Sequence, residues 1–235
     1  MNIKVLSSTV VKKETAKALN RLFAAQQGKE FLFLSSGGSS LGLLEYINPL
    51  NFGPKSTIGV LDERYSGDST VNNLAQMEMN NFYKQIHERG ALTIDTKMHS
   101  RESMEYLARR FEDQLKDWVA RTRGTIIASA GIGSDAHTSG IMPYPKDMKF
   151  FNDKFNDDAC WVAAYDAKEK NPHRMRVTTT LPFLRKINSV IVFVSDESKK
   201  SAINKLLSEN GTLNDSPCRI WREISDVEIY TDQKI

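Results

Sequence analysis

The chain has 235 residues, of which 40% are hydrophobic and 26% are charged, an ordinary composition for a globular protein with a sizeable core. The net charge of +3 comes from 32 basic and 29 acidic residues, and no basic stripe marks a surface for nucleic acid. No apolar run approaches the ~18 residues of a membrane helix, and the first residues do not have the pattern of a signal peptide. We therefore expect a cytoplasmic protein that binds neither nucleic acid nor membrane.

The cysteines and histidines do not indicate a metal site. Cys160 and Cys218 have no metal-ligand spacing and form no framework of pairs, so we expect free thiols in a reducing compartment. No Gly-x-Gly-x-x-Gly or Walker pattern is present, which argues against a nucleotide cofactor. The sequence thus predicts no metal and no cofactor, and it leaves a monomer or a small homo-oligomer open.

Short apolar runs alternate with longer amphipathic segments along the whole chain. The apolar runs predict strands at residues 2–6, 31–36, 57–61, 125–130, 160–166 and 189–195. Helical spacing of apolar residues predicts helices at residues 9–25, 40–47, 71–86, 102–121 and 197–208. Segment 142–159, with Pro143 and Pro145, is interpreted as a surface excursion, and 218–232 as short β elements.

This alternation predicts an α/β fold. We expect an open, mostly parallel sheet with helices on both faces, followed by a short β-rich C-terminal tail. No linker or repeat divides the chain, so residues 1–235 are predicted to form a single domain.

Four predicted strands run into glycine-rich or ionisable segments. In parallel sheets ligands bind beyond the carboxyl ends of the strands, so these segments are expected to meet at one site. They are Ser36-Gly37-Gly38-Ser39-Ser40, Asp62-Glu63-Arg64, the segment from Gly131 to Thr138, and the segment from Ser195 to Lys199.

Three of these segments have two interpretations each. Gly37 and Gly38 allow close approach to a phosphate at a helix start, or the segment is a plain turn that Ser39 or Ser40 caps. Arg64 is either a fork donor for an anion or part of a solvated strand end. Lys199, at a helix start where the dipole disfavours a cation, either neutralises an anion or is simply solvated.

His137 is the strongest single candidate for a catalytic residue. It lies among small residues directly after a strand, and Asp135 precedes it by two positions. An imidazole is the usual group for moving a proton near neutral pH. A lone histidine is usually structural or simply exposed, but the preceding Asp135 and the small neighbours leave room for a substrate, which makes His137 a candidate for proton transfer. His173, flanked by Arg174 and Arg176, marks a second possible anion-binding surface.

These segments, in this order, resemble those of the 6-phosphogluconolactonases, which belong with glucosamine-6-phosphate deaminases and ribose-5-phosphate isomerases to one sugar-phosphate superfamily. The strand–SGGSS, strand–DER and 131-GIGSDAHTSGIMP-143 segments carry the resemblance, which continues through 176-RVTTTLPFLRKINSVIVFVSDESKKSAI-203. Arg64 and Thr138 resemble the lactonases more than the deaminases, which have Asp-Glu-Tyr and Asp-Gly-His-Ile.

The resemblance implies hydrolysis of 6-phospho-D-glucono-1,5-lactone, a small phosphorylated sugar lactone, to 6-phosphogluconate in the oxidative pentose phosphate pathway. It implies catalytic roles for His137, Asp135 and Arg64. The substrate and its phosphate would be bound by Gly37, Gly38, Ser39, Ser40, Asp62, Arg176 and Lys199. Two alternatives remain, namely another phosphosugar deaminase or isomerase, and a non-catalytic sugar-phosphate-sensing domain.

The sequence departs from the family pattern at several positions near these residues. Ala136 stands where the family usually has glycine, Ser139-Gly140 where it has Ala-Ser, Leu41 where it has proline, and Asp196 where it has glycine. We expect an ordinary negative φ at Ala136, which would preserve the turn without a glycine.

Overall fold

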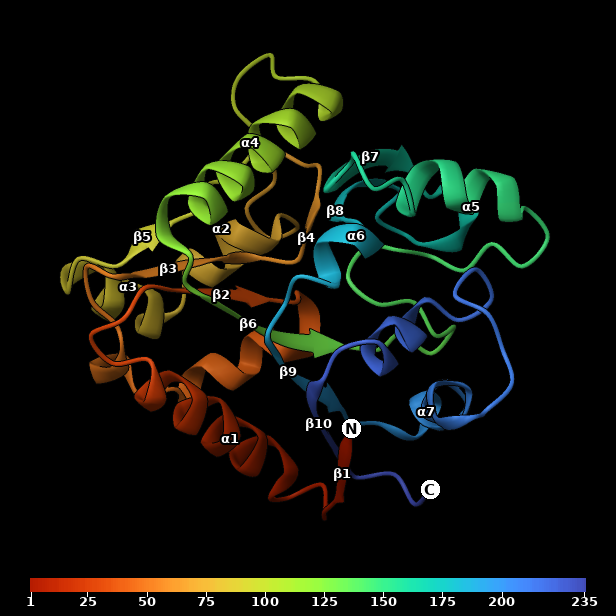
Figure 1. Cartoon of the computed structure of the whole chain (residues 1–235), viewed down its shortest axis with the longest axis horizontal. Coiled ribbons are helices and arrows are strands. Elements are labelled where there is room, and N and C mark those ends of the chain that lie inside the picture. Colours follow the sequence, from red (N-terminus) through yellow and green to blue (C-terminus); the bar gives the residue numbers. More distant parts are fainter.

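The computed structural model describes residues 1–235 and is built around a seven-stranded sheet (Figure 1). Its strands are β1 (Asn2–Val5), β2 (Phe31–Ser35), β3 (Ser56–Val60), β5 (Leu92–Thr93), β6 (Thr125–Gly131), β9 (Ser189–Val194) and β10 (Asp226–Thr231). They lie in the order β1-β10-β9-β6-β2-β3-β5, and every neighbouring pair is parallel. The predicted parallel α/β sheet is therefore confirmed.

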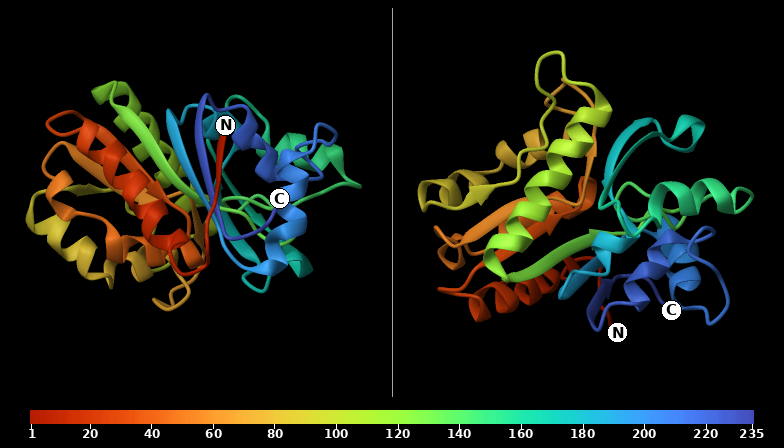
Figure 2. Two further views of the ribbon diagram at one scale, coloured as in Figure 1. Left: turned by 90° about the horizontal axis from the view of Figure 1, so that it is seen from below. Right: turned by 45° about the horizontal axis from the view of Figure 1, so that its top comes forward.

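Helices cover both faces of this sheet, because alternate strand residues point to opposite sides. Phe31 and Phe33 of β2 belong to one apolar core, and Leu32 and Leu34 belong to the other. The first core contains residues of α1 (Val11–Ala25), α2 (Asn73–Glu78) and α3 (Asn81–Glu88). The second contains residues of α4 (Met104–Thr122), α5 (Met148–Phe155), α6 (Leu181–Leu184) and α7 (Lys200–Leu207). Figure 2 shows the helices on the two faces of the sheet from two further directions.

A second, three-stranded antiparallel sheet was not predicted. It consists of β4 (Asp62–Arg64), β8 (Met175–Thr179) and β7 (Val162–Asp166), in the order β4-β8-β7. Leu61 joins the sheets, because its N–H donates to Ser35 O at 3.0 Å and its carbonyl accepts from Thr179 N at 3.0 Å. The expectation that 160–166 belongs to the parallel sheet is wrong, since periodicity does not reveal a strand's partner.

Several predicted elements differ from the structure in kind or extent. The helix predicted at 71–86 is two helices, because the Asn80 side chain accepts from Phe82 N and starts α3 anew. Residues 38–46 form a 3₁₀ helix, and segment 142–159 contains α5. The tail holds one strand, β10, preceded by a 3₁₀ helix at Pro217–Arg222 that buries Trp221. The apolar residues of this 3₁₀ helix pack in the same core as those of α7. The prediction of short β elements at 218–232 is wrong for this part of the tail.

Cys160 and Cys218 are both free thiols, and Cys218 is fully buried. None of the helices combines the length and the apolar character that crossing a membrane requires.

Candidate active site

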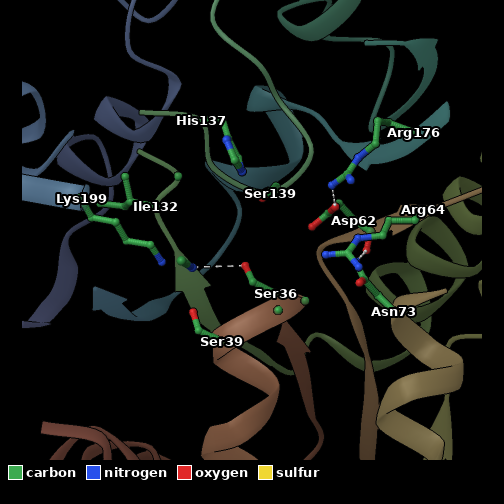
Figure 3. Close-up of a pocket in the computed structure, with 14 residues that line it drawn as sticks. Ser36, Ser39, Asp62, Arg64, Asn73, Ile132, His137, Ser139, Arg176 and Lys199 are labelled. Carbon is green, nitrogen blue, oxygen red and sulfur yellow. Dashed lines mark hydrogen bonds and ion pairs between the residues drawn. The ribbon is translucent and has the colours of Figure 1, made fainter. Parts of the chain in front are cut away.

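A polar cavity of about 250 Å³ lies at the carboxyl ends of the central parallel strands (Figure 3). Segments that follow β2, β3, β6 and β9 meet there, as the strand-end rule predicts. Its wall consists of Ser36, Gly37, Gly38, Ser39, Asp62, Arg64, Asn73, Gly131, Ile132, Gly133, His137, Ser139, Arg176 and Lys199.

The glycine-rich segment after β2 forms the floor of the cavity. Gly37 is required because a Cβ there would overlap the Asn73 amide, and Gly38 has a φ of 62°. The first N–H groups of the 3₁₀ helix that begins at Gly38 have no intrahelical acceptor and no side-chain cap. Ser39 lines the cavity, whereas Ser40 is fully buried behind the wall.

The charged segment after β3 is buried rather than solvated. Asp62 forms an ion pair with Arg176, and both side chains are almost completely buried. Removing Arg176 would leave the Asp62 carboxylate buried without its cation, so this arginine supports the fold as well as the cavity. Arg176 was predicted to bind the substrate phosphate, and the structure places it on the cavity wall with its charge opposite Asp62.

Arg64 remains free for a ligand. Its side chain donates no hydrogen bond within the protein, and its Nε is buried without a partner. Burial and the nearby Arg176 charge lower the pKa of the Arg64 guanidinium, which nevertheless stays charged at neutral pH because the ordinary value is so high. An unpaired, half-buried arginine on a cavity wall favours an anion or a developing negative charge as its partner.

His137 projects into the cavity from the loop after β6 (Figure 3). Its Nδ1 lies 2.6 Å from Asp135 Oδ1, which leaves Nε2 without a protein partner. Burial acts to raise the pKa of Asp135, but the hydrogen bond and charge of His137 outweigh it and hold that pKa below its ordinary value. An ionised Asp135 fixes the proton on Nδ1, so a neutral His137 presents the basic Nε2 to the cavity.

The loop around His137 is held from behind. Thr138 Oγ1 donates to Gly131 O at 2.8 Å and accepts from Trp221 Nε1 at 3.0 Å. The Cys218 N–H donates to Ala136 O at 3.0 Å. Ala136 has a φ of 72°, so the predicted negative φ is wrong. The backbone bonds on both sides of this turn, rather than the residue type, determine its conformation.

Lys199 lies across the cavity from the Asp62–Arg176 pair, with its ammonium group directed toward Ser39 (Figure 3). The ammonium group makes no hydrogen bond or ion pair in the protein, although it is partly buried. Burial lowers the pKa of Lys199, while the charges of Asp196 and Asp232 act in the opposite direction. Arg64 and Lys199 are thus two unpaired cations on opposite walls.

Buried polar side-chain atoms without hydrogen-bond partners concentrate at this cavity. Such atoms are normally satisfied, so a cluster of them calls for a ligand. The chain has six, namely Ser40 Oγ, Arg64 Nε, Asn72 Nδ2, Asn73 Oδ1, Ser139 Oγ and Arg176 Nε. Four belong to residues of the cavity wall.

Most predicted site residues therefore meet in one cavity, with Asp135 and Ser40 directly behind its wall. Asn73 and Ser139 are wall residues that were not predicted. The Asn73 side chain donates to Asp62 O at 2.9 Å. The sequence signal that could have identified Asn73 is its position at the start of the helix that follows Asp62-Glu63-Arg64. Of the two arginines that flank His173, Arg174 pairs with Asp166 on the surface, and Arg176 lies on the cavity wall.

The model of the family described as glucosamine-6-phosphate isomerases/6-phosphogluconolactonase matches residues 6–229. The chain belongs to this family. A search by sequence among curated proteins finds no match.

Solved structures share the fold over nearly the whole chain. A 6-phosphogluconolactonase from Shewanella baltica superposes with a TM-score of 0.77 at 16% identity, over 98% of this chain and 96% of that one. The 6-phosphogluconolactonase of Trypanosoma brucei gives 0.73 at 19%, over 98% and 95%. A monomeric glucosamine-6-phosphate deaminase gives 0.73 at 18%, over 99% and 98%. At these identities the likeness establishes the fold, and the reaction has to be argued from the site.

Proposed function

We propose that this protein is an enzyme that hydrolyses 6-phospho-D-glucono-1,5-lactone to 6-phospho-D-gluconate. The observation that carries the proposal is the His137–Asp135 pair facing a cavity that also holds two unpaired cations. These are the groups that hydrolysis of an anionic ester needs, namely a base for water, a donor for the oxyanion and a site for the phosphate.

The phosphate is assigned to the Lys199 side of the cavity. Lys199, Ser39 and the backbone of Gly37 and Gly38 offer a charge and several donors on that wall (Figure 3). Binding the remote phosphate there would place the lactone ring beneath His137 and fix its orientation. Ser40 and Arg176, which the sequence associated with the phosphate, lie behind the wall and beside Asp62, respectively.

Water attack then proceeds without a covalent intermediate. His137 Nε2 removes a proton from the water as it adds to the lactone carbonyl, and the imidazolium can return the proton to the leaving ring oxygen. The carbonyl oxygen becomes negative, and Arg64 is the unpaired donor assigned to it. The N–H groups of Gly131 and Gly133 already donate to Ser36 Oγ and His137 O, so they are not assigned to the oxyanion.

A deaminase or isomerase reaction fits the wall less well. Enolisation requires a base to remove a proton from carbon, in addition to the acid or base that opens the ring. Asp62 is the only carboxylate among the wall residues, and it is already engaged in a buried ion pair with Arg176. A purely sensing role would not explain why Nε2 of an oriented imidazole faces the cavity.

The proposal is tested by a lactonase assay on freshly generated lactone, coupled to 6-phosphogluconate dehydrogenase. The protein should accelerate product formation far above spontaneous hydrolysis and should release no ammonia from glucosamine-6-phosphate. Ammonia release without lactonase activity would replace the proposal by the deaminase alternative. Absence of both activities, with tight binding of 6-phosphogluconate, would favour a sensing domain.

A further inference from the structure

Ser139 combines two unfavourable features on the cavity wall. Its hydroxyl oxygen is buried without a hydrogen-bond partner, and its backbone has a φ of 50° although it is not glycine. An unsatisfied buried hydroxyl and a left-handed backbone each cost folding free energy. A glycine here would avoid both costs, so the serine side chain calls for a functional explanation.

Neighbouring strands impose this backbone conformation. The Gly140 N–H donates to Thr178 Oγ1 at 2.9 Å, and the Tyr165 hydroxyl donates to Gly140 O at 2.5 Å. A side chain at 140 would not fit, because its Cβ would lie 2.9 Å from Thr178 Cβ and 3.2 Å from Asp62 Cβ. The position of Ser139 is therefore fixed by β7 and β8, and only its side-chain torsion remains free.

The location of Ser139 indicates which part of a ligand it faces. Figure 3 places it between His137 and the Asp62–Arg176 pair, on the side of the cavity away from Lys199. Rotation about χ1 to another staggered position would present the hydroxyl to a molecule in the cavity. Because that hydroxyl has no protein partner to lose, a ligand group would gain its full hydrogen bond.

We propose that Ser139 determines specificity by binding the sugar hydroxyl on the carbon next to the lactone carbonyl. The inference rests on the proposed function, in which the phosphate lies toward Lys199 and the carbonyl lies beneath His137. The carbon beyond the carbonyl then lies toward Asp62 and Arg176, where Ser139 is. A site that hydrogen-bonds a substrate hydroxyl discriminates against the analogue that lacks it.

The test is a cycle of two substrates and two proteins. The substrates are 6-phosphoglucono-1,5-lactone and its 2-deoxy analogue, and the proteins are the wild type and Ser139→Ala. We expect the wild type to lose about tenfold in kcat/KM on the 2-deoxy lactone, the scale of one hydrogen bond. Ser139→Ala should be slow on both substrates to the same degree. Equal discrimination by the two proteins would overturn the inference.

Folding is controlled within the same experiment. The thermal midpoint of Ser139→Ala should not fall, because the variant removes an unsatisfied hydroxyl. If it does not fold, Ser139→Gly, which also relieves the backbone strain, takes its place in the cycle.

Failure of the proposed function would be visible separately, as a wild type without lactonase activity. In that case the wild type and Ser139→Ala are compared by calorimetry, through their affinities for 6-phosphogluconate and 2-deoxy-6-phosphogluconate. Discrimination that depends on Ser139 would sustain the inference, and its absence, or absence of binding, would overturn it.

Discussion

Three of the six residues other than glycine that have a positive φ lie in the two loops that carry His137 and Lys199. Ala136, Ser139 and Asp196 have φ values of 72°, 50° and 101°. Fixed neighbours hold each of them, since Ala136 O accepts from Cys218 N and the Asp196 N–H donates to Asp232 Oδ1 at 3.2 Å. Strain of this kind persists only where the surroundings impose it, and it clusters at functional sites.

Substitution of Ala136 by glycine changes the unfolding free energy through three small contributions that nearly cancel. Relief of the left-handed conformation gains ~1–2 kcal/mol, loss of a buried methyl group costs ~0.8 kcal/mol, and the wider unfolded ensemble costs ~0.4–1 kcal/mol. We expect Ala136→Gly to change the unfolding free energy by less than about 1 kcal/mol in urea titrations, with kcat within a few-fold. A large gain in activity would show instead that alanine distorts the His137 turn.

Lys199→Met tests the assignment of the phosphate. The variant keeps most of the apolar stem and removes one charge-assisted hydrogen bond, so KM for the phosphorylated lactone should rise by about tenfold or more. Kinetics on unphosphorylated gluconolactone should change little. Lys200→Met, at the exposed neighbouring lysine, is the matched control. Equal losses on both substrates would assign Lys199 to the fold or to the chemical step.

At the scale of elements, Glu63 connects the small sheet to α2. It accepts hydrogen bonds from Arg64 N at 2.7 Å, Asn73 N at 2.5 Å, Leu74 N at 3.0 Å and Thr96 Oγ1 at 3.0 Å. The start of α2 is thereby fixed, and with it the position of Asn73 on the cavity wall. Complete burial of the side chain raises the pKa of Glu63 to about 7, although these donors act in the opposite direction.

The raised pKa of Glu63 predicts how the unfolding free energy depends on pH. Between its ordinary value of 4.5 and about 7, Glu63 holds its proton in the folded chain and loses it in the unfolded chain. The folded state then binds more protons, so the unfolding free energy should fall as pH rises through this window. Urea unfolding of the wild type should show a steeper fall than that of Glu63→Gln, which cannot titrate. Parallel profiles would mean that Glu63 stays ionised when folded.

At the scale of the whole molecule, the sequence was sufficient to predict the parallel sheet and the edge at which the polar cavity lies. Continuous apolar runs identify buried strands, and the chemistry at their carboxyl ends follows from chain order alone. His137, Arg64 and Lys199 were predicted in this way, because each lies in a segment that follows a predicted parallel strand.

The remaining features depend on contacts that chain order does not contain. The Asp62–Arg176 pair forms because β4 pairs with β8, across 114 positions of sequence. The positive φ of Ala136 follows from bonds to Cys218 and Gly133, and alanine itself gives no sign of it. The unpartnered hydroxyl of Ser139 becomes visible only from the burial of that atom, which requires coordinates.

The central claim is that His137 activates water in this cavity to open a phosphorylated lactone. The most direct measurement compares kcat of the wild type and His137→Ala on freshly generated 6-phosphogluconolactone, with circular dichroism confirming that both are folded. We predict a loss of ~10²-fold or more, the scale of a general base. A folded variant that retains more than about a third of the wild-type kcat, far above that scale, would contradict the account.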